Sequence, residues 1–153
     1  KLNITNKCVL GISILAILSF GFSAFQGNAQ ITDRKKDYDI YLKANSDKSD
    51  VKSSLNDISK LEKKYGESDA LSISKINLYE KMNDYKNLQS EIEKVYNRYP
   101  QTRNTVSFVL LYSEVALKNG NKELSKNMIN EAIKLGAQDA YKERVDKVLS
   151  QLN

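Results

Sequence analysis

The sequence predicts an all-α protein, and three observations carry this prediction. Apolar residues recur at steps of three and four along most of the chain, which is the spacing of an amphipathic helix. Residues that break helices are sparse in residues 30–153, where glycine occurs three times and proline once. That stretch also lacks the sustained two-residue alternation, bounded by turns, that a half-buried strand requires. We therefore expect helices throughout residues 30–153.

The N-terminal segment, residues 1–29, has the features of a secretory signal peptide. Lys1 and Lys7 form a short basic region, and residues 9–20 are apolar. Small residues then lead up to Ala29, as they do before a signal-peptide cleavage site. The sequence therefore predicts cleavage after Ala29.

Cleavage after Ala29 predicts an exported protein, periplasmic or secreted, that begins at Gln30. The style of the signal and the abundance of Lys and Asn favour a bacterial source. The alternative left open is a membrane-anchored structural protein, because the apolar stretch 8–25 is near the lower limit for a membrane span. The single cysteine, Cys8, is lost with the segment, so helix packing and not disulfides must stabilise the rest of the chain.

Seven helices are expected after the signal peptide, and their bounds are 32–46, 50–65, 68–82, 84–98, 104–119, 121–135 and 139–151. Residues common just beyond a helix C-terminus mark their ends: Gly66, Pro100, Gly120 and Gly136. Side chains that cap helix N-termini precede three of them: Ser68, Asn121 and Asp139. Because the connections are short, neighbouring helices should form antiparallel hairpins.

The spacing of the breaking residues indicates an internal repeat. Gly66 and Pro100 lie 34 residues apart, and at this offset Ile58 aligns with Ile92. A period of about 34 residues that contains two helices is typical of one class of helical repeat. A single hairpin cannot bury its apolar face alone, whereas stacked hairpins share a continuous core.

The chain resembles the tetratricopeptide repeat family over about residues 35–151. With Asp69 as the first position of one repeat, Tyr79 stands where the family has its first-helix aromatic residue, and Pro100 stands at the near-terminal proline. The packing positions of the second helix are then Leu88, Ile92 and Val95. The resemblance implies antiparallel helix pairs stacked as a short α-solenoid.

A second repeat fits from Val106, after about three extra residues, and a weaker unit begins near Lys35. The packing positions of the second repeat are Ser125, Ile129 and Ala132. The helix 139–151 would be the terminal cap that such arrays need. The family's early tryptophan is absent, with Ser72 and Val109 in its place. A generic helical bundle with evenly spaced breakers is the alternative.

The resemblance implies a protein-binding scaffold, such as an adaptor in a bacterial envelope or secreted assembly. Its groove would be lined by the first helix of each pair, and the partner would be a helix or an extended peptide. The groove positions carried over from the family are Ile73, Asn77, Glu80, Lys81, Ser107, Leu110, Glu114, Leu117 and Lys118, with Asp39 and Lys43 from the weaker unit.

Two of these groove positions, Leu110 and Leu117, have a second interpretation. The helix 104–119 is apolar on more than one face, and a helix that is apolar all round is usually buried. Leu110 and Leu117 therefore either line the groove or belong to the core.

The composition argues against most other functions. The sequence has no His and one Cys, so we expect no Ser-His-Asp or Cys-His catalysis and no ordinary zinc site. The isolated glycines form no phosphate-binding loop. The net charge of +5 falls to +3 without Lys1 and Lys7, and the remaining charges are of mixed sign, which disfavours a nucleic-acid surface. We expect no enzyme, no cofactor and no metal; a small ligand-binding domain is a less favoured alternative.

Overall fold

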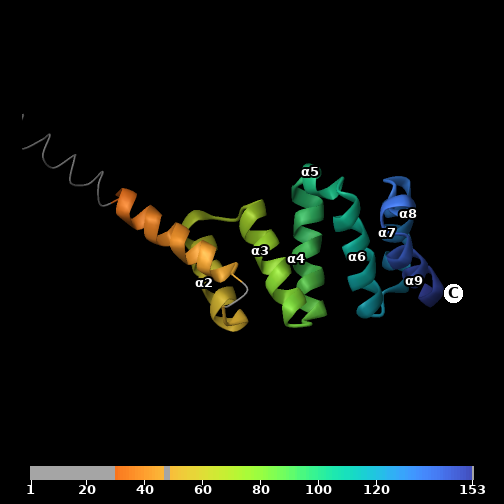
Figure 1. Ribbon diagram of the computed structural model, residues 1–153, viewed down its shortest axis with the longest axis horizontal. Coiled ribbons are helices and arrows are strands. Elements are labelled where there is room, and N and C mark those ends of the chain that lie inside the picture. The colour runs from red at the N-terminus through yellow and green to blue at the C-terminus, as the bar shows by residue number, and fades with distance from the viewer. Residues whose placement is uncertain (1–29, 47–48, 153) are drawn as a thin grey trace, which may run out of the picture. The chain divides into compact units, whose positions relative to one another are not determined.

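A computed structural model describes residues 30–46 and 49–152 (Figure 1). Helices joined by short turns make up these ranges, and no strand occurs in them. The predicted signal peptide and its cleavage after Ala29 lie outside the described residues. The chain divides into two compact units, residues 1–43 and 44–153.

The helices are close to those expected from the sequence. Among the described residues, 30–44 form one helix, and eight more follow: α2 (Val51–Tyr65), α3 (Asp69–Lys81), α4 (Tyr85–Arg98), α5 (Pro100–Arg103), α6 (Val106–Lys118), α7 (Lys122–Lys134), α8 (Ala137–Ala140) and α9 (Lys142–Leu152). The short helices α5 and α8 were not expected. Asp139 lies inside α8 and not at the start of the last helix, so its predicted role as an N-cap is wrong. No helix in the described ranges is long and apolar enough to cross a membrane.

Four of the helices begin with a side-chain cap. At the start of α2, α3, α4 and α7, a side-chain oxygen accepts a hydrogen bond from the backbone N–H three residues ahead, at 2.8, 3.3, 3.2 and 3.1 Å respectively. The capping residues are Asp50, Ser68, Asp84 and Asn121. The predictions for Ser68 and Asn121 are thus confirmed. Each such cap satisfies a backbone donor that has no partner inside the helix.

The segment α3–α5 recurs as α6–α8 with a shift of 37 residues. The starting residues of the three matched pairs are Asp69 and Val106, Tyr85 and Lys122, and Pro100 and Ala137. The turns between the paired helices also match, because Asn83 (φ 55°) and Gly120 (φ 78°) occupy the same left-handed position. In each turn the residue after the left-handed one donates its N–H to a carbonyl five residues back: Asp84 to Tyr79 at 3.0 Å, and Asn121 to Ala116 at 2.9 Å. The repetition therefore extends to individual backbone bonds.

The core of residues 44–153 forms between neighbouring helices. α3 packs on α4 and α6 on α7, while α4 contacts α6 and α9 contacts both α6 and α7; Figure 1 shows α3, α4 and α6 in succession. The predicted packing positions of both second helices are completely buried: Leu88, Ile92, Val95, Ser125, Ile129 and Ala132. Burying a large aliphatic side chain contributes about 1.5–3 kcal/mol, so Leu88, Ile92, Val95 and Ile129 each add substantially to the stability of this unit.

A buried cluster of charges joins α2, α3 and α4. The ammonium of Lys75, which is only 5% exposed, lies 2.7 Å from a carboxylate oxygen of Glu62 and 3.2 Å from one of Glu91. Burial lowers the pKa of Lys75, but the hydrogen bond to Glu62 and the negative charge of Glu91 outweigh it, so that the pKa lies above its usual 10.5. Lys75 therefore remains charged inside the protein.

Candidate functional site

Two adjoining hollows lie along α3, α6 and α9. One, of about 310 Å³, extends from the end of α3 to α9. The other, of about 360 Å³, lies between α3 and α6 and reaches α9 through Arg144. Glu80 and Leu111 line both hollows, so we treat the two as one surface and call it the first-helix groove.

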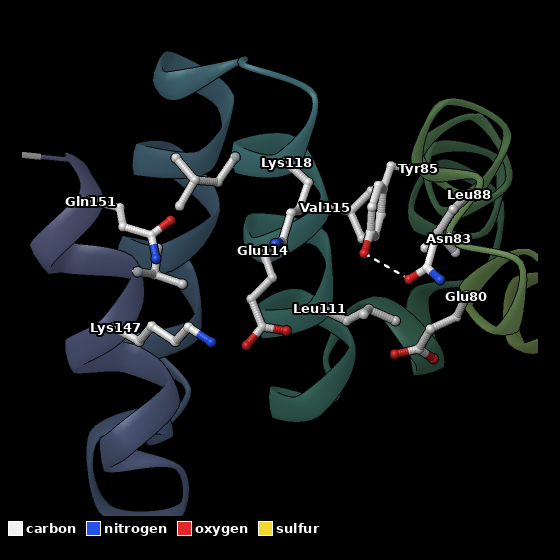
Figure 2. Close-up of a pocket in the computed structure, with 12 residues that line it drawn as sticks. Glu80, Asn83, Tyr85, Leu88, Leu111, Glu114, Val115, Lys118, Lys147 and Gln151 are labelled. Carbon is white, nitrogen blue, oxygen red and sulfur yellow. Dashed lines mark hydrogen bonds between the residues drawn. The ribbon is translucent and has the colours of Figure 1, made fainter.

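The floor of the first-helix groove is apolar and its rim is polar. The floor presents the partly buried side chains of Ile73, Leu111 and Leu117, and beneath them lie the buried Ile76, Leu88, Phe108, Val115 and Val148. The rim carries Asn77, Glu80, Ser107, Glu114, Lys118, Arg144, Lys147 and Gln151. In Figure 2, Lys147 and Gln151 approach from α9 while Tyr85 stands on the opposite side of α6. Such a surface buries apolar side chains of a ligand and orients it through its edges.

An ion pair crosses the first-helix groove and fixes α9 against α6. Arg144 donates from Nε and Nη2 to the two carboxylate oxygens of Glu114, at 2.8 and 2.6 Å. The hydrogen bonds to Glu114 raise the pKa of Arg144 above its usual value. The guanidinium also lies 5.6 Å from the ring centre of Tyr141. A bidentate pair of this kind restrains both side chains, so the wall of the groove is preformed.

A second set of contacts holds one end of the groove. The side-chain amide of Asn119 donates to the carbonyl of Tyr85 at 2.8 Å and to the side-chain oxygen of Gln89 at 2.7 Å. The Tyr85 hydroxyl donates to Asn83 at 2.9 Å (Figure 2), and the Lys118 ammonium lies 5.8 Å from the centre of the Tyr85 ring. These contacts join the C-terminus of α6 to the N-terminus of α4.

Most of the groove positions expected from the family resemblance line this surface. Those that do so are Ile73, Asn77, Glu80, Ser107, Glu114, Leu117 and Lys118. Lys81 lines a separate hollow that Asn77 and Glu80 border as well. Asp39 and Lys43 are exposed residues of the first unit. The first helices of the two matched pairs thus place seven of the expected side chains along one surface.

Leu110 does not line the groove, and of its two interpretations the structure supports the core. Its side chain is completely buried and belongs to the core, whereas Leu117 is partly buried and lines the groove. The physical reason is that α6 packs against α4, α7 and α9 at once, so it buries more than one of its faces.

Sequence reasoning missed the part of the groove that α9 supplies. Arg144, Lys147, Val148 and Gln151 all line it, although the last helix was expected only as a cap. Their spacing of three and four residues places them on one side of a helix, which is the signal that was present in the sequence.

Other kinds of site receive no support from the described residues. Over residues 30–46 and 49–152, no group of three or more acidic, His or Cys side chains could hold a metal ion. No family model matches the chain, and no curated protein or solved structure matches it either.

Proposed function

We propose that residues 44–153 form a short tetratricopeptide-like α-solenoid that binds a protein or peptide in the first-helix groove. The recurrence of α3–α5 as α6–α8, with the same turn between the paired helices, supports the repeat architecture. Stacked pairs of this kind present their first helices as a shared, extended surface.

The observation that carries the proposal is the construction of the groove. An apolar floor contributed by several helices lies beneath a polar rim, and the bidentate pair of Arg144 and Glu114 fixes part of that rim. A preformed groove loses little conformational freedom when a ligand binds, which favours affinity. Amphipathic helices and extended peptides are ligands of such grooves.

We further propose that the protein is an exported adaptor with a binding role and not a catalytic one. The features of residues 1–29 support export, either with cleavage after Ala29 or with the apolar segment retained as an anchor. The absence of His from the sequence and the mixed charges of the groove support a scaffold that has no cofactor and no nucleic-acid partner.

Charge and bulk added to the rim should weaken peptide binding at least tenfold while the fold is kept. We would select peptides against the full chain from a displayed random library and measure their affinity by fluorescence anisotropy. The test variant is Asn77→Arg/Lys118→Glu, which changes exposed residues of the groove. An arginine and a reversed charge placed at the rim obstruct the groove and alter its electrostatic complementarity.

The matched control is Asn97→Arg/Lys126→Glu. It makes the same two changes at exposed positions of α4 and α7 that do not line the groove. The control should bind the peptides as the unmodified chain does. Equal affinity of the peptides for both variants would refute the groove as the binding site.

A further inference from the structure

The helix formed by residues 30–44 exposes an unusual amount of apolar surface. Six large hydrophobic side chains in the described ranges are exposed, and four of them belong to this helix: Ile31 (67%), Tyr38 (60%), Ile40 (38%) and Leu42 (49%). Soluble surfaces tolerate scattered apolar side chains, but a concentration of them marks an interaction site.

Three of these side chains form a stripe along one face of the helix. Tyr38 lies seven residues after Ile31, and Leu42 lies four residues further, which places all three on the same side at 3.6 residues per turn. The ring of Tyr41 stacks on that of Tyr38, with their centres 6.4 Å apart and an angle of 22° between the rings. Ile40 lies on the opposite side of the helix from Ile31, because nine residues separate them.

Three charged residues border the stripe, and two of them, Arg34 and Lys35, are basic whereas the third, Asp39, is acidic. Arg34 and Lys35, both exposed, precede Tyr38 by four and three residues and so lie on either side of the stripe. Asp33 and Asp37 fall on the other side of the helix, whereas the exposed Asp39 lies beside the stripe, four residues after Lys35 and three before Leu42. The helix therefore combines an apolar stripe, an aromatic pair and flanking cations on one face.

We propose that this face of the helix 30–44 binds the surface of an anionic lipid bilayer. The stripe would enter the boundary between headgroups and acyl chains, and Arg34 and Lys35 would extend their charged ends to the lipid phosphates. Tyr rings suit this boundary because one end is apolar and the other polar. The excess of cations along the border of the stripe, two against the one carboxylate of Asp39, favours an anionic lipid over an apolar protein surface as its partner. This binding site lies outside the first-helix groove and does not depend on it.

Tryptophan fluorescence tests the proposal directly, because the natural chain has no Trp. Tyr38→Trp places a single reporter on the stripe, and Ile40→Trp places one on the opposite side without changing the charge. The full chain would be mixed with vesicles of phosphatidylglycerol and phosphatidylcholine, some carrying a nitroxide on the acyl chain. Emission from the Tyr38→Trp chain should move to shorter wavelength and be quenched by the nitroxide, whereas emission from the Ile40→Trp chain should change much less. The comparison of the two positions holds whether or not residues 1–29 are present.

The role of the flanking cations has its own test in the Tyr38→Trp background. Arg34→Gln/Lys35→Gln should lower the partition coefficient for the anionic vesicles roughly thirtyfold at low salt, since each cation near such a surface strengthens binding about fivefold. Circular dichroism would confirm that both variants keep their helix content. Vesicles of phosphatidylcholine alone should bind the Tyr38→Trp chain weakly.

Three results would overturn the proposal. The first is emission from the Tyr38→Trp chain that does not change with anionic vesicles. The second is equal quenching of the reporters at positions 38 and 40, because the helix would then have no preferred face. The third is a wavelength shift that depends on protein concentration in the absence of lipid, which would assign the stripe to contact with a second copy of the chain.

Discussion

Replacing Lys75 with methionine should lower the free energy of unfolding by about 3–5 kcal/mol. The substitution removes the cation between Glu62 and Glu91, and it leaves Glu91 with only the more exposed Lys94, 3.4 Å away, as a counter-charge. Glu91 is only 5% exposed, and one of its carboxylate oxygens already has no hydrogen-bond partner. Urea denaturation followed by circular dichroism would measure the loss.

The control is Lys60→Met, which removes an exposed ion pair on the neighbouring helix α2. Lys60 lies 3.1 Å from Asp57, and its side chain is 66% exposed, so its loss should change stability by less than about 1 kcal/mol. In the double variant Lys75→Met/Glu91→Leu, where a buried carboxylate is removed as well, part of the lost stability should return. A Lys75→Met variant as stable as the unmodified chain would show that the cluster is not buried as described.

The same cluster predicts how stability depends on pH. Because the pKa of Lys75 is raised above its usual 10.5, folding favours the protonated form, and this contribution is complete below about pH 10.5. It is lost as the pH rises through the higher pKa of the folded state. The unmodified chain should therefore lose more stability in alkaline solution than Lys75→Met does.

Replacing Leu110 with alanine should cost about 2–5 kcal/mol, because it opens a cavity at a completely buried position. The control is Leu135→Ala, because the Leu135 side chain is 36% exposed. Its free energy of unfolding should fall by about 1 kcal/mol or less. The folded fraction of Leu110→Ala should bind selected peptides with unchanged affinity, since Leu110 does not line the groove. If Leu110→Ala were as stable as the unmodified chain but did not bind the peptides, Leu110 would line the groove and not belong to the core.

The seven longer helices could be predicted because their information is local. Apolar periodicity, capping side chains and terminal glycines all act within a few residues, and the bounds of these helices came within three residues of the structure. The short helices α5 and α8 could not be predicted, because a helix of four residues is too short to show an apolar periodicity. Pro100 lies just beyond the C-terminus of α4, as predicted, and it also begins α5, where its fixed φ and missing N–H suit the first helical position.

The residues of the groove could be predicted only where the resemblance to a repeat assigns them to positions that line a groove. The resemblance places residues of α3 and α6 in the groove, but it has no position for Arg144, which reaches Glu114 across 30 residues of sequence. Lys75 shows the same limit, because pattern alone assigns a lysine to the surface, and its burial depends on Glu62 in α2 and Glu91 in α4. Leu110 and the partly exposed Leu111 differ only in which face of α6 meets a neighbouring helix.

The most direct measurement of the proposed function is a map of backbone amide shifts in the nitrogen-labelled full chain, titrated with a selected peptide. If the first-helix groove is the binding surface, the largest changes should fall on α3, α6 and α9, along the residues that line it. Changes concentrated on the exposed faces of α4 and α7, with α3, α6 and α9 unaffected, would contradict a groove built from the first helices of stacked pairs.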